Sequence, residues 1–305
     1  HTPQGHEVID GVIYAKDWSA IIFNPSFPYR FSHMLLASGL TASFLIAGLS
    51  AYRLLIGDNK IAPKLALKTA TYTAAVLIPL QILAGDMHGL NTLEHQPQKV
   101  AAMEGVWETE QGAPLLLFAI PDEQERTNHA ELAIPNLASF ILTHELDGEI
   151  KGLNEFRGEH PPVAPVFYSF RVMVGMGILM LFAAWAGSYY LFRRGELPDW
   201  LGKLFIAMSF SGWVATLAGW YVTEVGRQPY LVSGVLRTAD AVTGLPPQNI
   251  GLSFALYAVI YAVLMVAYIR TLTLMCRKSV GIEEISKGDA DERHTNKLDI
   301  ASSNA

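Results

Sequence analysis

Residues 204–230 decide the fold, and they read LFIAMSFSGWVATLAGWYVTEVGRQPY. The apolar run from Leu204 to Thr223 has about the twenty residues that a helix needs to cross a bilayer. The carboxylate of Glu224 follows at once, and Pro229 then prevents the helix from continuing. Because an acid at a membrane boundary is costly, we interpret Glu224 as a candidate functional residue. The plainer alternative is a capping acid beside an aromatic belt.

The composition extends this interpretation to the whole chain. Of its 305 residues, 51% are hydrophobic and only 16% are charged, and the mean hydropathy is +0.26. Soluble domains usually carry about 25% charged residues, so these values indicate a polytopic membrane protein. The net charge of −6 provides no basic patch, and we expect no nucleic-acid partner. Cys276 is the one cysteine, which excludes a disulfide within the chain.

Five apolar runs are long enough to span the hydrocarbon of a membrane. They cover residues 31–56, 65–84, 167–192, 204–223 and 250–275. We therefore predict an all-α polytopic protein with five transmembrane helices in a single membrane domain, 1–305. A segment at 1–30 precedes the first span, a large loop at 86–166 separates the second and third, and a polar, mobile tail is expected at 279–305.

Positively charged residues predict the orientation of these spans. Three clusters alternate along the chain as five spans require: Arg53, Lys60, Lys64 and Lys68; Arg193, Arg194 and Lys203; Arg270, Arg277 and Lys278. The cytoplasm is expected to hold all three clusters and the C-terminus. The segment 1–30, the loop 86–166 and the Gly-Arg-Gln-Pro loop then lie on the outer side.

Two side chains suited to binding iron lie just inside spans that enter from the outer side. His33 follows Arg-Phe-Ser in the first span, and Met173 follows Phe-Arg-Val in the third. Their depths differ by a few residues, or about 5 Å. Imidazole and thioether together form a known axial pair for a low-spin haem. The alternatives are an interfacial polar residue for His33 and simple packing for Met173.

Three further residues are candidates for contacts with a bound haem. Trp220 precedes Glu224 by four residues, so the two share a helix face, and the indole could pack on a macrocycle bound at the acid. Arg171 either extends toward the interface or pairs with a haem propionate. Arg227, just beyond the fourth span, is a second propionate candidate.

The loop 86–166 carries a charged pair in the segment Gln98-Lys99-Val-Ala-Ala-Met-Glu104. A quinol head group needs acceptors for its hydroxyl protons and a donor for its oxygens, and Lys99 with Glu104 could supply both. A solvated amphipathic helix is the alternative on charge pattern alone.

Several blocks together resemble one family, subunit I of the cytochrome bd-type quinol oxidases. The matching blocks are Phe31-Ser-His33, Gly85-Asp86, Lys99 to Glu104 with Trp107-Glu108, Phe170 to Met173, and Gly226 to Pro229. They occur in the family's order, and nearly the whole chain lies within the region that they mark.

The resemblance implies a cofactor set. His33 and Met173 would ligate a low-spin haem b, and Glu224 would ligate the haem that binds oxygen, with Trp220 between haems. It also implies that Lys99 and Glu104 act in quinol oxidation. The implied partners are quinol, O2, the lipid membrane and a second oxidase subunit. The implied location is the bacterial cytoplasmic (inner) membrane.

The chain also departs from the family pattern. The family has nine spans and this chain shows five, so it is similar to the C-terminal five-span portion. The histidine ligand of a further high-spin haem b is expected outside this chain. The loop 86–166 resembles the short-loop forms, including those called cyanide-insensitive, which leaves haem d or a second haem b at the oxygen site. A membrane cytochrome b that relays electrons, and a haem-free transporter or scaffold, remain the alternative functions.

Overall fold

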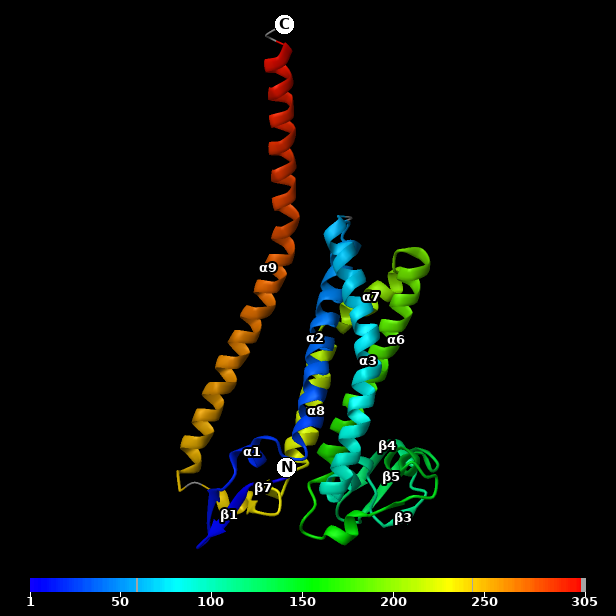
Figure 1. The fold of residues 1–305 in the computed structure, drawn as a ribbon, viewed down its shortest axis with the longest axis vertical. Coiled ribbons are helices and arrows are strands. Elements are labelled where there is room, and N and C mark those ends of the chain that lie inside the picture. Colours follow the sequence, from blue (N-terminus) through cyan, green and yellow to red (C-terminus); the bar gives the residue numbers. More distant parts are fainter. Residues whose placement is uncertain (59, 243, 303–305) are drawn as a thin grey trace. The chain divides into compact units, whose positions relative to one another are not determined.

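The computed structural model describes residues 1–58, 60–242 and 244–302, with side chains as far as Met275 (Figure 1). Among these residues, five helical segments are long and apolar enough to span a membrane. They are α2 (Phe27–Leu55), α3 (Ile61–His95), α6 (Val163–Arg194), α7 and α8 together (Asp199–Val225), and Pro247–Met275 of α9. The predicted helical membrane fold with five spans is confirmed.

The chain forms two compact units, which we describe separately. The first comprises residues 1–52 and 61–242, and the second comprises 53–60 and 243–305. In the second unit Arg53 pairs with the buried carboxylate of Asp58 at 2.6 Å, and α9 runs from Pro247 to Ser302. The tail expected at 279–305 is thus helical as far as Ser302, and 303–305 lie outside the described residues. The expectation of a single membrane domain stays a prediction.

Two of the helical segments differ in detail from the predicted spans. Helix α3 continues past residue 84 as far as His95, so the Gly85-Asp86 block that was assigned to the loop is helical. Nothing in this stretch interrupts a helix until Pro97. The fourth span is broken by a 3-10 turn, Met208–Phe210, between α7 (Asp199–Ala207) and α8 (Ser211–Val225). Ser209 donates to the carbonyl of Ile206 at 2.7 Å there, a bond that favours a bend.

Small residues let the helices of the first unit approach closely. Helix α6 packs against both α3 and α8. A methyl group on Gly48 of α2 would lie 2.6 Å from the carbonyl oxygen of Phe205, so only glycine fits there. The rings of Phe44 and Phe205 stack at 5.8 Å, and both are fully buried. This seam of small residues and paired rings is typical of membrane helix packing.

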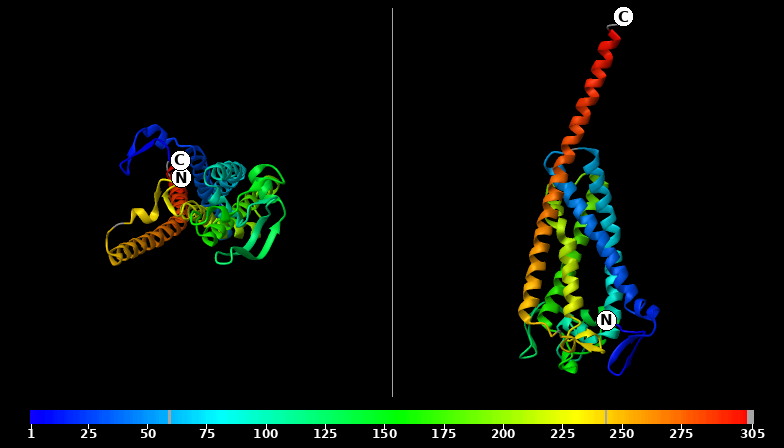
Figure 2. Two further views of the ribbon diagram at one scale, coloured as in Figure 1. Left: turned by 90° about the horizontal axis from the view of Figure 1, so that it is seen from below. Right: turned by 90° about the vertical axis from the view of Figure 1, so that its left-hand side faces the viewer.

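The segments before and between the spans contain short strands that we did not predict from the sequence. The pairs are β1 (His6–Ile9) with β2 (Val12–Ala15), β3 (Glu110–Gln111) with β6 (Glu149–Ile150), β4 (Leu115–Asp122) with β5 (Thr127–Ile134), and β7 (Tyr230–Val232) with β8 (Leu236–Arg237). Short helices accompany them: α1 (Trp18–Ile22), α4 (Pro97–Glu104), α5 (Leu137–Thr143), and 3-10 turns at Leu153–Phe156 and Thr238–Ala241. Within the first unit, these strands gather at one end of the long helices (Figures 1 and 2). The segment between α3 and α6 therefore forms a folded cap at this end of the helices.

Candidate functional site

Helix α4 forms the centre of the candidate site, and its sequence explains its limits. Pro97 occupies the first helical turn, where its missing N–H costs nothing, and Gly105 ends the helix in the left-handed conformation with φ 73°. The helix is buried, with Lys99 only 2% and Glu104 only 4% exposed. The alternative of a solvated amphipathic helix is therefore wrong. Two charged side chains are placed where water does not stabilise them.

Lys99 extends from α4 toward the end of α8. Its Nζ donates to Gln96 Oε1 at 2.7 Å and to the carbonyl oxygen of Thr223 at 3.4 Å. The aliphatic stem lies against Gly226, where an added methyl group would meet Lys99 Cγ and Cε at 3.1 Å. Burial, followed by the charges of Arg30 and Arg227, lowers the pKa of Lys99 to about 7. The amine can therefore exchange a proton near neutral pH.

Glu104 points instead toward α6. Its carboxylate accepts from Arg171 Nη2 at 3.1 Å. The same guanidinium donates to the carbonyl oxygen of Leu116, at 2.9 Å from Nε and 2.7 Å from Nη2, and to that of Met103. Burial raises the pKa of Glu104, and Arg171 opposes that rise. Arg171 thereby joins α6, α4 and β4.

The two charged residues of α4 thus serve different neighbours. Five residues along a helix correspond to a rotation of about 140° between side chains. Lys99 accordingly faces the Thr223–Gly226 turn, whereas Glu104 faces Arg171. We predicted from the sequence that Lys99 and Glu104 act as one pair. In the structure, their side chains lie on different sides of the short helix α4. A ligand that used both would have to reach around α4.

His33 lies on α2 against one face of α3. Its ring nitrogens are 3.1 and 3.3 Å from the Gln81 amide nitrogen, and its ring centre is 5.7 Å from that of His88. A methyl group on Gly85 would lie 3.3 Å from His33 Cε1. Positions 81, 85 and 88 follow helical spacing, so these three residues form one stripe on α3. Gln81 Oε1 is buried without a hydrogen-bond partner among the described residues.

Met173 lies on α6 and faces α8. An added methyl group on Gly219 would lie 3.0 Å from Met173 Sδ, so the thioether sits over this glycine. On the neighbouring turn of α6, methyl groups on Gly175 or Gly177 would meet nothing within 4 Å. His33 and Met173 therefore contact different helices, α3 and α8, and the open space on α6 lies at Gly175 and Gly177. With the unpartnered Gln81 Oε1 near His33, these features fit a flat polar-edged group such as haem.

Glu224 ends α8 and is half exposed, with 51% of its side chain accessible. Its Oε2 accepts from Arg227 one turn later, and its Oε1 lies 3.9 Å from His1 Nε2. Arg227 Nε is buried without a hydrogen-bond partner among the described residues. Trp220, one turn before the acid, is 61% exposed on the same helix. The carboxylate is accessible to a ligand, unlike that of Glu104.

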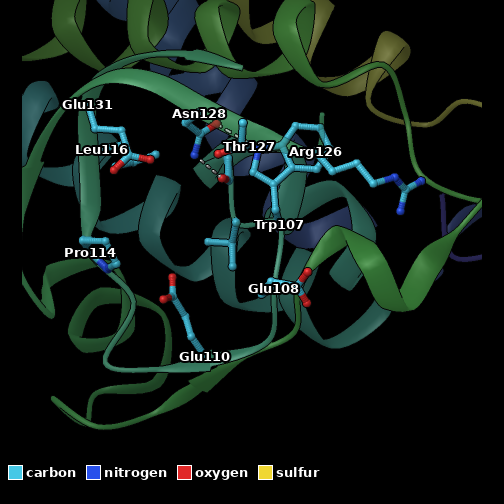
Figure 3. A pocket seen from close by; sticks show the side chains of 11 residues that line it. Trp107, Glu108, Glu110, Pro114, Leu116, Arg126, Thr127, Asn128 and Glu131 are labelled. Atoms are coloured by element: carbon cyan, nitrogen blue, oxygen red, sulfur yellow. Dashed lines mark hydrogen bonds between the residues drawn. The ribbon is translucent and has the colours of Figure 1, made fainter. Parts of the chain in front are cut away.

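A polar pocket of about 250 Å³ lies beside the end of α4 (Figure 3). Asn128 of β5 connects its walls, since it accepts from Trp107 Nε1 and donates to the carbonyl oxygen of Gly105, both at 2.9 Å. Burial and the nearby charge of Glu131 raise the pKa of Glu110, which also lines the pocket. The two hydrogen bonds of Asn128 thus attach the hairpin β4–β5 to Gly105 and Trp107, at the C-terminal end of α4.

Sequence reasoning assigned no role to Arg30, Gln81 or His88. A signal was present for each: Arg30 is one turn before His33, and Gln81 and His88 are polar residues at helical spacing around Gly85. We predicted that a loop starts at residue 86. His88 was therefore not recognised as part of the same helix face as Gln81 and Gly85.

The fold and site define a class: a helical membrane protein in which side chains of types that can bind iron lie on three different spans, toward the ends that meet a folded cap. A family model described as cytochrome bd terminal oxidase subunit I matches residues 1–280. The chain belongs to this family.

Individual relatives agree with the family match. The chain is 31% identical over 306 residues to cytochrome bd ubiquinol oxidase subunit 1 of Bacillus subtilis (strain 168), covering 96% of this chain and 63% of the relative. It is 27% identical to cytochrome bd-II ubiquinol oxidase subunit 1 of Escherichia coli (strain K12), covering 82% and 62%. The solved bd oxidase from Geobacillus thermodenitrificans superposes with a TM-score of 0.81 at 31% identity, over 91% of this chain and 64% of that one. The chain thus spans less than two thirds of the length of these relatives.

Proposed function

We propose that this chain is the haem- and quinol-binding part of a quinol:oxygen oxidoreductase in a bacterial cytoplasmic membrane. The family match over residues 1–280 is the observation that carries the proposal. The geometry supports it, because His33, Met173 and Glu224 lie near the same cap-bearing end of their helices. The C-terminus would face the cytoplasm, as the Lys and Arg clusters predict.

In this proposal His33 and Met173 hold the low-spin haem b, and Glu224 holds haem d or a second haem b. Haem iron supplies one-electron transfer and oxygen reduction when it is bound. The protein's contribution is position: α2 and α6 present the imidazole and thioether, and the end of α8 presents an anionic oxygen. Trp220 would lie between haems. A histidine elsewhere in the whole subunit would hold a further high-spin haem b.

Arg227 and Arg171 are proposed to differ in how readily they can bind a haem propionate. Arg227 keeps a buried Nε without a described partner, which suits it to a haem propionate. Arg171 remains a second propionate candidate, but its guanidinium already donates to Glu104 and to two carbonyl oxygens. Its use by a propionate would require one of these bonds to be exchanged.

Quinol oxidation is assigned to the two sides of α4. Each quinol gives up two electrons and two protons, so two quinols reduce one O2 to two waters with four protons. Lys99, with a pKa of about 7, can take or give a proton near neutral pH, and the raised pKa of Glu104 suits that carboxyl group to the same role. Protons released on the outer side and consumed from the inner side would contribute to a proton gradient. A second oxidase subunit would complete the assembly.

An optical spectrum of the purified oxidase tests this proposal. We expect a reduced low-spin b band and a second haem that responds to CO. A single b band without a CO response would identify an electron-relay cytochrome instead. A protein purified in native membranes without any haem would contradict both and leave a transporter or scaffold.

A further inference from the structure

A second cavity lies at the start of α2 and is lined in part by His1, whose Nδ1 is 3.3 Å from Lys99 Nζ. Its volume is about 370 Å³. Phe27, Phe31 and Met34 form an apolar wall, whereas the polar rim consists of His1, Asn24 and Ser26. The rim is fixed by hydrogen bonds, since Ser26 Oγ donates to Asn24 Oδ1 at 2.8 Å and Thr2 Oγ1 donates to the same atom at 2.9 Å. The cavity therefore has one apolar side and one polar side at the boundary of a membrane span.

Arg30 supplies the charge in this cavity. It is one of the lining residues, and its Nε is buried without a hydrogen-bond partner among the described residues. A buried guanidinium N–H that lacks an acceptor costs free energy, so such a group is expected to meet an oxygen in the working protein. The position of Arg30 one turn from the apolar wall favours an acceptor carried on an apolar body.

The charges around Arg30 do not balance. Arg30, Arg227 and Lys99 influence one another electrostatically, and Glu224 is the acid that acts on all of this group. Arg227 also has a buried Nε without a described partner. Two arginines near one half-exposed carboxylate, beside a lysine that is only partly protonated near neutral pH, attract further negative charge, especially where the surroundings are poor in water.

We propose that this cavity binds an oxyanion on an apolar body, with Arg30 as its charge partner. Two sources carry that chemistry: the phosphate of an acidic phospholipid and the propionate of a haem. The apolar wall would contact the acyl chain or the macrocycle, and the guanidinium would donate through Nε to the anionic oxygen. The haem source rests on the proposed function, whereas the lipid source does not.

The test uses the purified oxidase that contains this chain, with Arg30→Gln and Arg30→Lys as variants. Arg157→Gln is the matched control, because that arginine is exposed and lies outside the cavity. The first measurement is native mass spectrometry of delipidated protein titrated with dioleoyl phosphatidylglycerol or dioleoyl phosphatidylcholine. The second is the midpoint potential of each haem, since a nearby cation favours the reduced state.

The two sources give different results. If a lipid phosphate binds, Arg30→Gln weakens phosphatidylglycerol binding about tenfold, Arg30→Lys restores part of it, and both haem potentials stay unchanged. If a propionate binds, Arg30→Gln lowers one haem potential, Arg30→Lys recovers it, and lipid binding is unaffected. Wild-type lipid binding and potentials in a folded Arg30→Gln protein would overturn the proposal. Absence of haem from the wild type would defeat the proposed function but leave the lipid measurement valid.

Discussion

Glu104–Arg171 and Glu224–Arg227 are the same pair of residue types in two different surroundings. In the first, the side chains are 5% and 16% exposed and lie 3.1 Å apart. In the second, they are 51% and 22% exposed, and the two residues are one helical turn apart. Arg171 also donates to two backbone carbonyls, whereas Arg227 keeps a buried Nε without a described partner.

The difference in exposure means that the Glu104–Arg171 pair is held within the fold, whereas the Glu224 carboxylate can be reached by a ligand. A buried pair with its donors engaged resists change, because removing one partner leaves a charge without water or a counter-ion. A half-exposed pair contributes little to stability, so its carboxylate is available to bind a ligand. A change at the buried pair should therefore mainly lower stability, whereas the matching change at the half-exposed pair should mainly lower haem content.

The largest effect is expected from Arg171→Gln. It leaves the Glu104 carboxylate buried without its partner, which should lower the free energy of unfolding by about 3–5 kcal/mol. Arg227→Gln, the matched change at the exposed pair, should cost less than about 1 kcal/mol. Thermal unfolding in detergent measures both. Equal losses in the two variants would remove the contrast between the pairs.

Glu224→Ala should leave stability nearly unchanged but remove the oxygen-site haem and spare the low-spin haem. Glu224→Gln should be almost as damaging, because a neutral amide is a poor substitute for an anionic oxygen ligand. Haem content and the CO-difference spectrum provide the measurement. An unaltered high-spin band with normal oxygen uptake would show that the accessible carboxylate is not a ligand.

Met173→Leu tests whether the residue beside Gly219 is a ligand or only packs. The substitution keeps volume and apolarity, so packing alone should change the free energy of unfolding by less than about 1.5 kcal/mol. As a ligand, its loss should convert the low-spin haem to high-spin and lower its potential, and Met173→His should restore a low-spin centre. An intact low-spin band in Met173→Leu would exclude the thioether.

Lys99→Ala tests the quinol assignment on the side of α4 that faces α8. We expect a higher KM for quinol or a lower kcat with both haems retained. Glu104→Gln should do the same from the other side, and because it leaves Arg171 buried without its counter-ion, it should also lower the free energy of unfolding. Loss of a haem in either variant would show that α4 holds the sites in place and does not bind quinol.

The smallest effect concerns pH. The pKa of Lys99 falls from 10.5 to about 7 on folding, so between those values the unfolded chain binds more protons than the folded one. Stability should therefore rise with pH from about 7 to 10.5 on account of this residue. Lys99→Met should flatten that rise in the thermal midpoint. Parallel curves for the wild type and Lys99→Met would show that folding does not lower the pKa of Lys99.

The spans were predictable because runs of apolar residues determine which segments cross a membrane, and the candidate ligands lie on those spans. The partners of Lys99 and Glu104 were not predictable. Thr223 and Arg171 are distant in sequence from Lys99 and Glu104. Helical geometry predicts that the two side chains of α4 point in different directions, but it does not identify the residues that they contact. The hairpin β4–β5 was also missed, since its strands are stabilised by contacts with α6 and the cap of α4. The extension of α3 to His95 was hidden by polar residues that a helix tolerates.

The length of α3 has a consequence for the choice of host membrane. Its 35 residues correspond to about 52 Å, while the hydrocarbon layer is about 30 Å thick. Roughly four turns therefore project beyond the hydrocarbon, and the stretch from Asp86 to His95 has the polarity for that position. A thicker or thinner bilayer would shift where lipid meets this polar extension without bending the stripe of Gln81, Gly85 and His88. Expression in a host with different acyl chains should therefore preserve the geometry around His33.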